Sequence, residues 1–104
     1  MILRRSRFHD LVDRQLDLFE SETDLLAEAA EADAAWSRAE ADESEELYGD
    51  YQLVVDAISD ALLEIRETYA ATLDADTAEE YRAEFGKAAR KRFGRVASQL
   101  QEDG

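Results

Sequence analysis

The chain has 104 residues, with 26 acidic and 12 basic side chains and a formal net charge of −14 at pH 7. This charge argues against direct binding to nucleic acid or to an anionic membrane, because both would repel the protein. The lack of cysteine excludes disulfides, thiolate metal sites and cysteine nucleophiles. Proline is also absent and glycine occurs four times, so the residues that usually separate strands and hairpins are scarce. We therefore expect an all-α protein.

The apolar runs of the chain indicate its compartment. None approaches the ~20 residues that span a bilayer. Arginines stand at positions 4, 5 and 7, but acidic residues interrupt the apolar segment that follows, which therefore differs from a signal peptide. We expect a cytoplasmic protein that forms a single helical domain over residues 1–104.

The first predicted helix covers about residues 5–40 and has two opposite faces. One face carries apolar residues at spacings of three and four, which indicates an amphipathic helix. These residues are Phe8, Leu11, Val12, Leu18, Phe19, Leu25, Leu26 and Ala29. The other face carries an acidic series from Asp10 to Glu31, which we interpret as a solvated outer surface.

A helix boundary near Ser21 and Thr23 is the alternative, because both side chains can cap the first turn of a new helix. The apolar series, however, passes through Glu22 without a change of register. We therefore predict one continuous helix, whose second half is rich in alanine and supplies little side-chain volume to a core.

The central helix, predicted over about residues 45–73 after a break within 41–44, has the strongest periodicity. Its apolar side consists of Leu47, Tyr51, Val54, Ile58, Leu62, Ile65, Tyr69 and Leu73. A third helix, over about residues 77–100, begins at a capping box formed by Thr77 and Glu80. Helices of this kind need partner helices to be stable.

Short connections make neighbouring helices antiparallel, so we predict an up-down-up antiparallel three-helix bundle with two long helices and a shorter third. The charges agree with this topology, which brings the basic residues of 85–101 towards the acidic segment 28–46. It also places Arg4, Arg5 and Arg7 near Asp74, Asp76, Glu79 and Glu80.

The rise of ~1.5 Å per helical residue predicts which side chains share a level. Phe8, Tyr69 and Tyr81 fall at one height. Glu22 and Arg92 fall at another, each within the apolar side of its helix. We predict an inward-facing ion pair between them that sets the register, because a single buried charge would be costly.

The shorter third helix leaves one end of the bundle covered by only two helices. Trp36, Leu47, Tyr48 and Tyr51 meet at this end. Exposed aromatic residues rimmed by charge are typical of protein contact surfaces, so we predict an interaction site here. The alternative is that the C-terminal segment or a bent helix covers the cluster.

These features predict a non-enzymatic interaction protein that associates with itself as a homodimer. The alternative is an acidic regulator that binds a basic partner, such as a DNA-binding protein, by mimicking nucleic acid. We expect no catalytic residue, no cofactor and no metal, because His9 is the only histidine and no nucleophile, histidine and acid combination is present.

One acidic pattern supports a lesser alternative. The run Asp42-Glu43-Ser44-Glu45-Glu46 followed by Glu64-x-x-Glu67 resembles the paired carboxylate motifs of the MazG-like nucleotide pyrophosphohydrolases, an all-helical family. The resemblance implies a carboxylate metal site and magnesium-dependent hydrolysis of nucleotides. Magnesium requires converging oxygens, and Glu67 faces away from the apolar side of the central helix.

Overall fold

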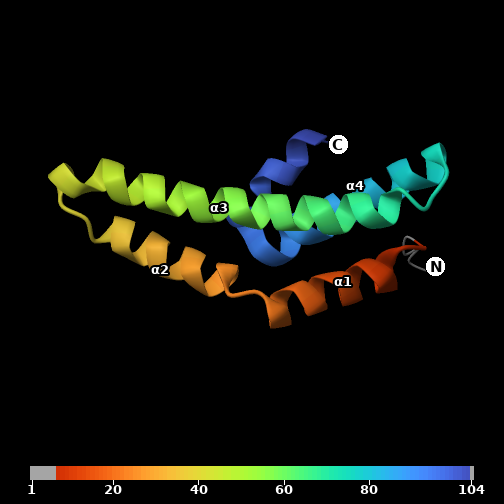
Figure 1. The fold of residues 1–104 in the computed structure, drawn as a ribbon, viewed down its shortest axis with the longest axis horizontal. Helices are drawn as coiled ribbons and strands as arrows, with labels where there is room; N and C mark the ends of the chain where they lie inside the picture. The colour runs from red at the N-terminus through yellow and green to blue at the C-terminus, as the bar shows by residue number, and fades with distance from the viewer. Residues whose placement is uncertain (1–6, 104) are drawn as a thin grey trace, which may run out of the picture.

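The computed structural model describes the backbone of residues 7–103 and the side chains of residues 7–100. The order of elements is α1 (His9–Glu22), α2 (Leu25–Ser37), α3 (Ala41–Ala70), α4 (Ala75–Phe93) and the 3₁₀ helix η1 (Gly94–Asp103). No strand occurs within this part of the chain, so the predicted all-α class is confirmed. In Figure 1, α1 and α2 run in one direction, the long α3 returns beside them, and α4 reverses again.

The predicted count of three helices is wrong, because the expected helix over residues 5–40 is divided in two. Thr23 has an extended backbone, with φ −95° and ψ 146°, and its Oγ1 accepts a hydrogen bond from the N–H of Leu25 over 3.1 Å. A threonine that bonds to a nearby backbone group competes with the helical ladder. This local bond divides the helix although the apolar series continues across it.

The later helix boundaries also differ from the predictions. The break before α3 lies at residues 38–40, so Ala41 already begins the helix. The carboxylate of Asp74 accepts a hydrogen bond from the N–H of Thr77 over 2.9 Å, so Asp74 caps α4 in place of the expected capping box. The α-helix ends at Phe93 and does not reach residue 100, because Gly94 has φ 68°, a conformation that favours glycine.

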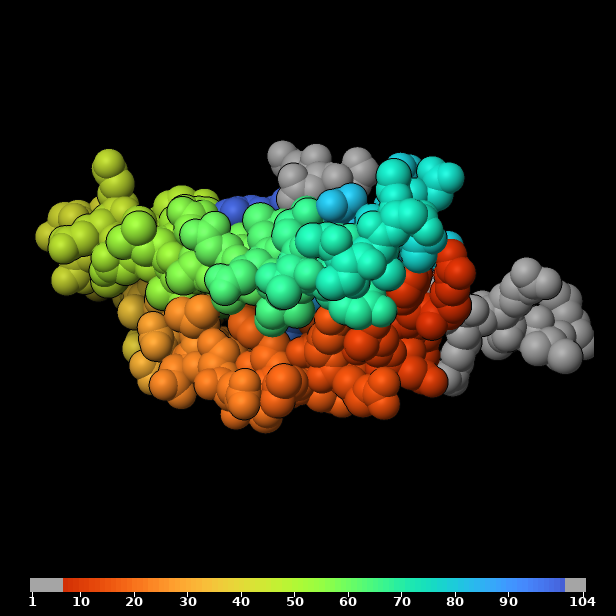
Figure 2. Space-filling model, turned by 45° about the vertical axis from the view of Figure 1, so that its right-hand side comes forward, coloured from red at the N-terminus to blue at the C-terminus, as the bar shows by residue number. Residues whose placement is uncertain are grey.

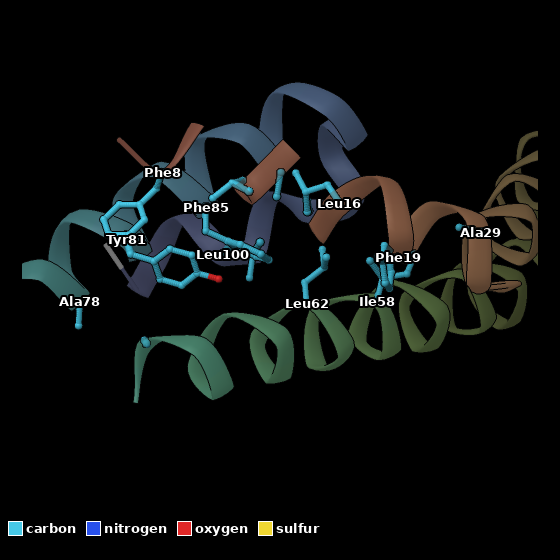
Figure 3. Packing of buried hydrophobic residues seen from close by; sticks show 14 residues of the cluster. Phe8, Leu16, Phe19, Ala29, Ile58, Leu62, Ala78, Tyr81, Phe85 and Leu100 are labelled. Carbon is cyan, nitrogen blue, oxygen red and sulfur yellow. The ribbon is translucent and has the colours of Figure 1, made fainter. Parts of the chain in front are cut away.

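The core combines side chains from all five elements. Phe8 packs edge-on against Tyr69 and Tyr81, with ring centroids 6.4 and 5.4 Å apart, and the rings of Tyr69 and Tyr81 are 4.8 Å apart. This confirms the predicted aromatic level. Figure 3 shows the core extending from Tyr81 and Phe85 to Phe19 and Ala29, and η1 contributes Leu100.

The helices do not pack equally on one another. α2 packs along α3, whereas α1 packs chiefly on α4, and η1 packs on α3 and α4. None of the described helices combines the length and the hydrophobicity of a membrane span. The separation between α1 and α3 leaves a groove between these two helices, which is described below.

Candidate protein-interaction site

The structure brings together the aromatic residues predicted at the end of the bundle. The ring centroids of Trp36 and Tyr48 are 4.7 Å apart, and Trp36 stacks on Tyr51 with a centroid distance of 5.8 Å. Tyr51 is buried, Trp36 is half-buried and Tyr48 is 44% exposed. Leu47, the fourth predicted member, is half-buried on α3. We call Trp36, Tyr48 and Tyr51 the aromatic tip.

The start of η1 covers one side of the aromatic tip. The guanidinium of Arg95 lies 5.5 Å from the ring centroid of Tyr51, and its Nη2 donates to the Asp33 carboxylate over 2.5 Å. A cavity of about 230 Å³ remains between the tip, Arg95 and Gln99. The alternative of a covering C-terminal segment therefore applies to Tyr51, while Tyr48 stays accessible.

The predicted ion pair between Glu22 and Arg92 is wrong. Nη2 of Arg92 lies 2.8 Å from Asp13 Oδ1, and its Nη1 lies 2.6 Å from Asp17 Oδ1 and 3.4 Å from Glu20 Oε1. The hydrogen bond to Asp17 raises the pKa of Arg92 above its ordinary value. Because α1 leans on α4, its acidic outer face meets the basic end of α4, and Glu22 is left exposed.

The basic residues near the N-terminus give a second test of charge placement. Nη2 of Arg7 lies 3.0 Å from Oε1 of Glu80, which confirms the expected approach of these two segments. Arg4 and Arg5 lie outside the described residues. Both side chains of this ion pair are exposed, so it contributes only ~0–1 kcal/mol to the free energy of unfolding. Its value is as evidence that the N-terminal segment lies beside the start of α4.

A larger feature, absent from the sequence predictions, is an open groove of about 770 Å³ between α1 and α3. Its apolar lining consists of Leu18, Phe19, Ala61, Ile65 and Tyr69. Its polar lining consists of Gln15, Glu22, Thr23, Glu64, Thr68 and Thr72. In Figure 2, α1, coloured red to orange, lies side by side with the green to teal part of α3; we call the groove between them the α1–α3 groove.

The α1–α3 groove exists because the chain bends at Thr23. Beyond the bend α2 packs closely on α3, whereas before it α1 leans towards α4. Val12, Leu16 and Phe19 are buried by this packing, and the ring of Phe19 meets that of Phe93 edge-on at 5.8 Å. Leu18 consequently points away from the core and is 57% exposed at the edge of the groove.

Sequence periodicity alone assigned Leu18 to the core and omitted Leu16. Both residues belong to apolar series on α1, since Leu11 and Leu18 share one side while Val12, Leu16 and Phe19 share the next. A helix with a wide apolar surface can bury either part. The wide apolar surface of α1 was the sequence feature that could have indicated a second contact surface on this helix. The position of α4 decides which part of that surface stays exposed.

The acidic pattern with an enzymatic resemblance does not converge on one point. Glu46 and Glu64 both belong to the single helix α3, and 18 residues of helical rise separate them by ~27 Å. Among the described residues, no group of three histidine, aspartate or glutamate side chains is arranged to hold a metal ion. Within one chain the acids of this pattern therefore lie far apart along α3.

Glu67 has an internal role. Arg82 donates two hydrogen bonds to its carboxylate, from Nε to Oε2 over 2.9 Å and from Nη2 to Oε1 over 2.8 Å. Nε of the buried Arg66 donates to Oε2 over 2.7 Å. These bonds, with that from Arg82 the stronger, lower the pKa of Glu67 from 4.5 to about 2. The carboxylate of Glu67 thus links α3 to α4 through its hydrogen bonds with Arg82.

No known protein family, curated protein or solved structure matches this chain. The function must therefore be inferred from the exposed surfaces of the chain itself. Among the described residues, the α1–α3 groove and the outer side of the aromatic tip both leave apolar or aromatic side chains exposed.

Proposed function

We propose that this chain is a non-enzymatic, cytoplasmic protein that binds another protein through the α1–α3 groove. The observation that carries the proposal is an apolar groove of about 770 Å³ with Leu18 57% exposed at its edge. Water-exposed apolar surface bordered by polar groups is characteristic of protein contact sites.

The shape of the groove favours a polypeptide over a small molecule. Its α1 wall from Gln15 to Thr23 measures ~12 Å, and its α3 wall from Ala61 to Thr72 measures ~16 Å, at ~1.5 Å per residue. Small-molecule sites enclose their ligand and orient it with converging polar groups. Here Glu22 and Glu64 stand on opposite walls of an open groove, an arrangement that suits two to three turns of a docked helix.

A photo-crosslinking amino acid placed at position 18 tests the proposal, and the same substitution at position 53 provides the control. Leu53 is 69% exposed on α3 and does not line the groove. In the protein's own cells, we expect a discrete crosslinked partner from position 18 and none from position 53. Equal crosslinking from both positions, or none from position 18, would contradict the proposal.

Self-association through the aromatic tip is a second candidate. It is favoured by Tyr48, which is 44% exposed while its ring centroid lies 4.7 Å from that of the half-buried Trp36. Such an amphipathic aromatic pair is a common anchor at protein interfaces. Light scattering tests it: the proposed homodimer should dissociate on Tyr48→Ala and persist in Leu53→Ser. A monomeric wild-type protein would remove this candidate and leave the α1–α3 groove proposal unaffected.

A further inference from the structure

We infer that the partner of the α1–α3 groove is an amphipathic helix with lysine or arginine on both sides of its apolar stripe. This inference rests on the proposed function and specifies the chemistry of the partner. Two properties of the groove support it: the charge of its walls and the nature of its lining.

The charged residues that line the groove are both acidic. Glu22 stands on the α1 wall and Glu64 on the α3 wall, and both are exposed. Neither forms an ion pair with a described residue, in contrast to Asp13, Asp17 and Glu67, which bind arginines of α4. A docked helix therefore meets one unneutralised carboxylate on each flank. Lysine and arginine suit both flanks, because their methylene stems cover apolar surface while their charged ends reach a carboxylate.

The apolar lining of the α1–α3 groove determines which residues the partner helix needs on its docked side. The half-buried Ala61, Ile65 and Tyr69 supply apolar surface, and Leu18 extends it to the rim. A helix that covers this surface needs apolar residues at spacings of three, four and seven, so that they face one side. The partner is therefore apolar on one side and basic on both flanks of that side.

Selection from a displayed library of helical peptides tests the inference. The peptides have about 16 residues, enough to span the longer wall of the groove, with a constant apolar stripe and randomised flanking positions. The full chain serves as the target. We expect the selected peptides to be enriched in lysine and arginine at the flanks, and their affinity to fall as the salt concentration rises.

Two pairs of variants locate the binding. Leu18→Ser should weaken a selected peptide by about tenfold or more, whereas Leu53→Ser should leave its affinity unchanged. Glu22→Lys combined with Glu64→Lys should also weaken it by about tenfold. Glu31→Lys combined with Glu46→Lys changes the net charge equally at exposed positions outside the groove and should have a much smaller effect.

The outcomes separate the inference from the proposed function. Selected peptides with neutral or acidic flanks that still lose affinity on Leu18→Ser would overturn the inferred chemistry and leave the groove as a binding site. Peptides that bind the Leu18→Ser variant as tightly as the wild type, or a selection without enrichment, would overturn both.

Discussion

The two halves of α3 are covered in different ways, although they belong to one continuous helix. In its N-terminal half α2 packs closely along it, and Tyr51 is buried beneath Trp36 and Arg95. In its C-terminal half α4 covers one side, while the side towards α1 remains open as the α1–α3 groove. One helix therefore carries both a closed and an open surface.

Side-chain size and the bend at Thr23 together explain this difference. Six of the 13 residues of α2 are alanines, and small side chains let two helix backbones approach closely. α1 presents larger residues, and its buried side, centred on Leu16, packs towards α4. The small side chains of α2 let it pack closely over α3. α1 packs on α4 instead and leaves the α1–α3 groove open.

The largest expected effect comes from removing the anchor of α1. Leu16→Ala should lower the free energy of unfolding by about 2–5 kcal/mol, because Leu16 is 1% exposed and its loss leaves a cavity. Leu18→Ala, two residues away on the same helix, should change it by less than about 0.5 kcal/mol. Urea denaturation measures both. Similar losses for the two variants would mean that α1 packs on α3 as well as on α4.

The turn at Gly94 directs η1, with Arg95, over Tyr51 in the N-terminal half of α3. Gly94→Ala should cost about 1–3 kcal/mol, because its φ of 68° strains any residue with a β-carbon. The space around it is open, so the cost comes from the backbone. Gly49→Ala in α3 is the control and should stabilise the protein by about 0.5–1 kcal/mol. Thermal denaturation should show melting temperatures that shift in opposite directions, and a neutral Gly94→Ala would contradict the strained turn.

The bend itself is the third target. Thr23→Ala removes the hydroxyl that accepts from the N–H of Leu25 and should cost about 1 kcal/mol. Chemical denaturation measures the loss, and circular dichroism reports the helix content. A variant that gains both helix content and stability would show that the chain prefers a continuous helix, and the α1–α3 groove would then lose its structural basis.

The smallest effect concerns the attachment of α3 to α4. Glu67→Gln should cost about 0.5–1 kcal/mol at pH 7, a modest value because the carboxylate is 44% exposed and screened by solvent. Since the pKa of Glu67 is lowered from 4.5 to about 2, this contribution is complete above pH 4.5 and is lost as the pH falls towards 2. Denaturation curves should therefore show a stability difference between the wild type and Glu67→Gln at pH 7, and this difference should shrink near pH 2. A constant difference would assign the effect to packing.

The aromatic residues show how far local rules reach. The level shared by Phe8, Tyr69 and Tyr81 follows from helical rise and antiparallel pairing, and the structure reproduces it. The meeting of Trp36 with Tyr48 and Tyr51 follows in the same way from the short connection between α2 and α3. Both depend on distances along helices, which the chain specifies locally.

The ion-pair partner of Arg92 shows what helical rise and antiparallel pairing cannot predict. Its height along the bundle was predictable, but its direction depends on the rotation of α1 about its own axis. That rotation places Asp13 and Asp17 on the side of α4 and leaves Glu22 on the groove. A change of one position around a helix is ~100°, which is enough to exchange an ion pair for an exposed charge.

By itself the sequence determined that the protein is all-α, which residues can face a core and which aromatic rings lie level with one another, because these depend on periodicity and helical rise. Only the tertiary structure decided that the first helix divides at Thr23, that Leu16 and not Leu18 is buried, and that a groove opens between α1 and α3. The physical reason is that α1 has more apolar surface than one neighbour can cover. Which part is covered depends on contacts with α4, a helix more than fifty residues later in the chain.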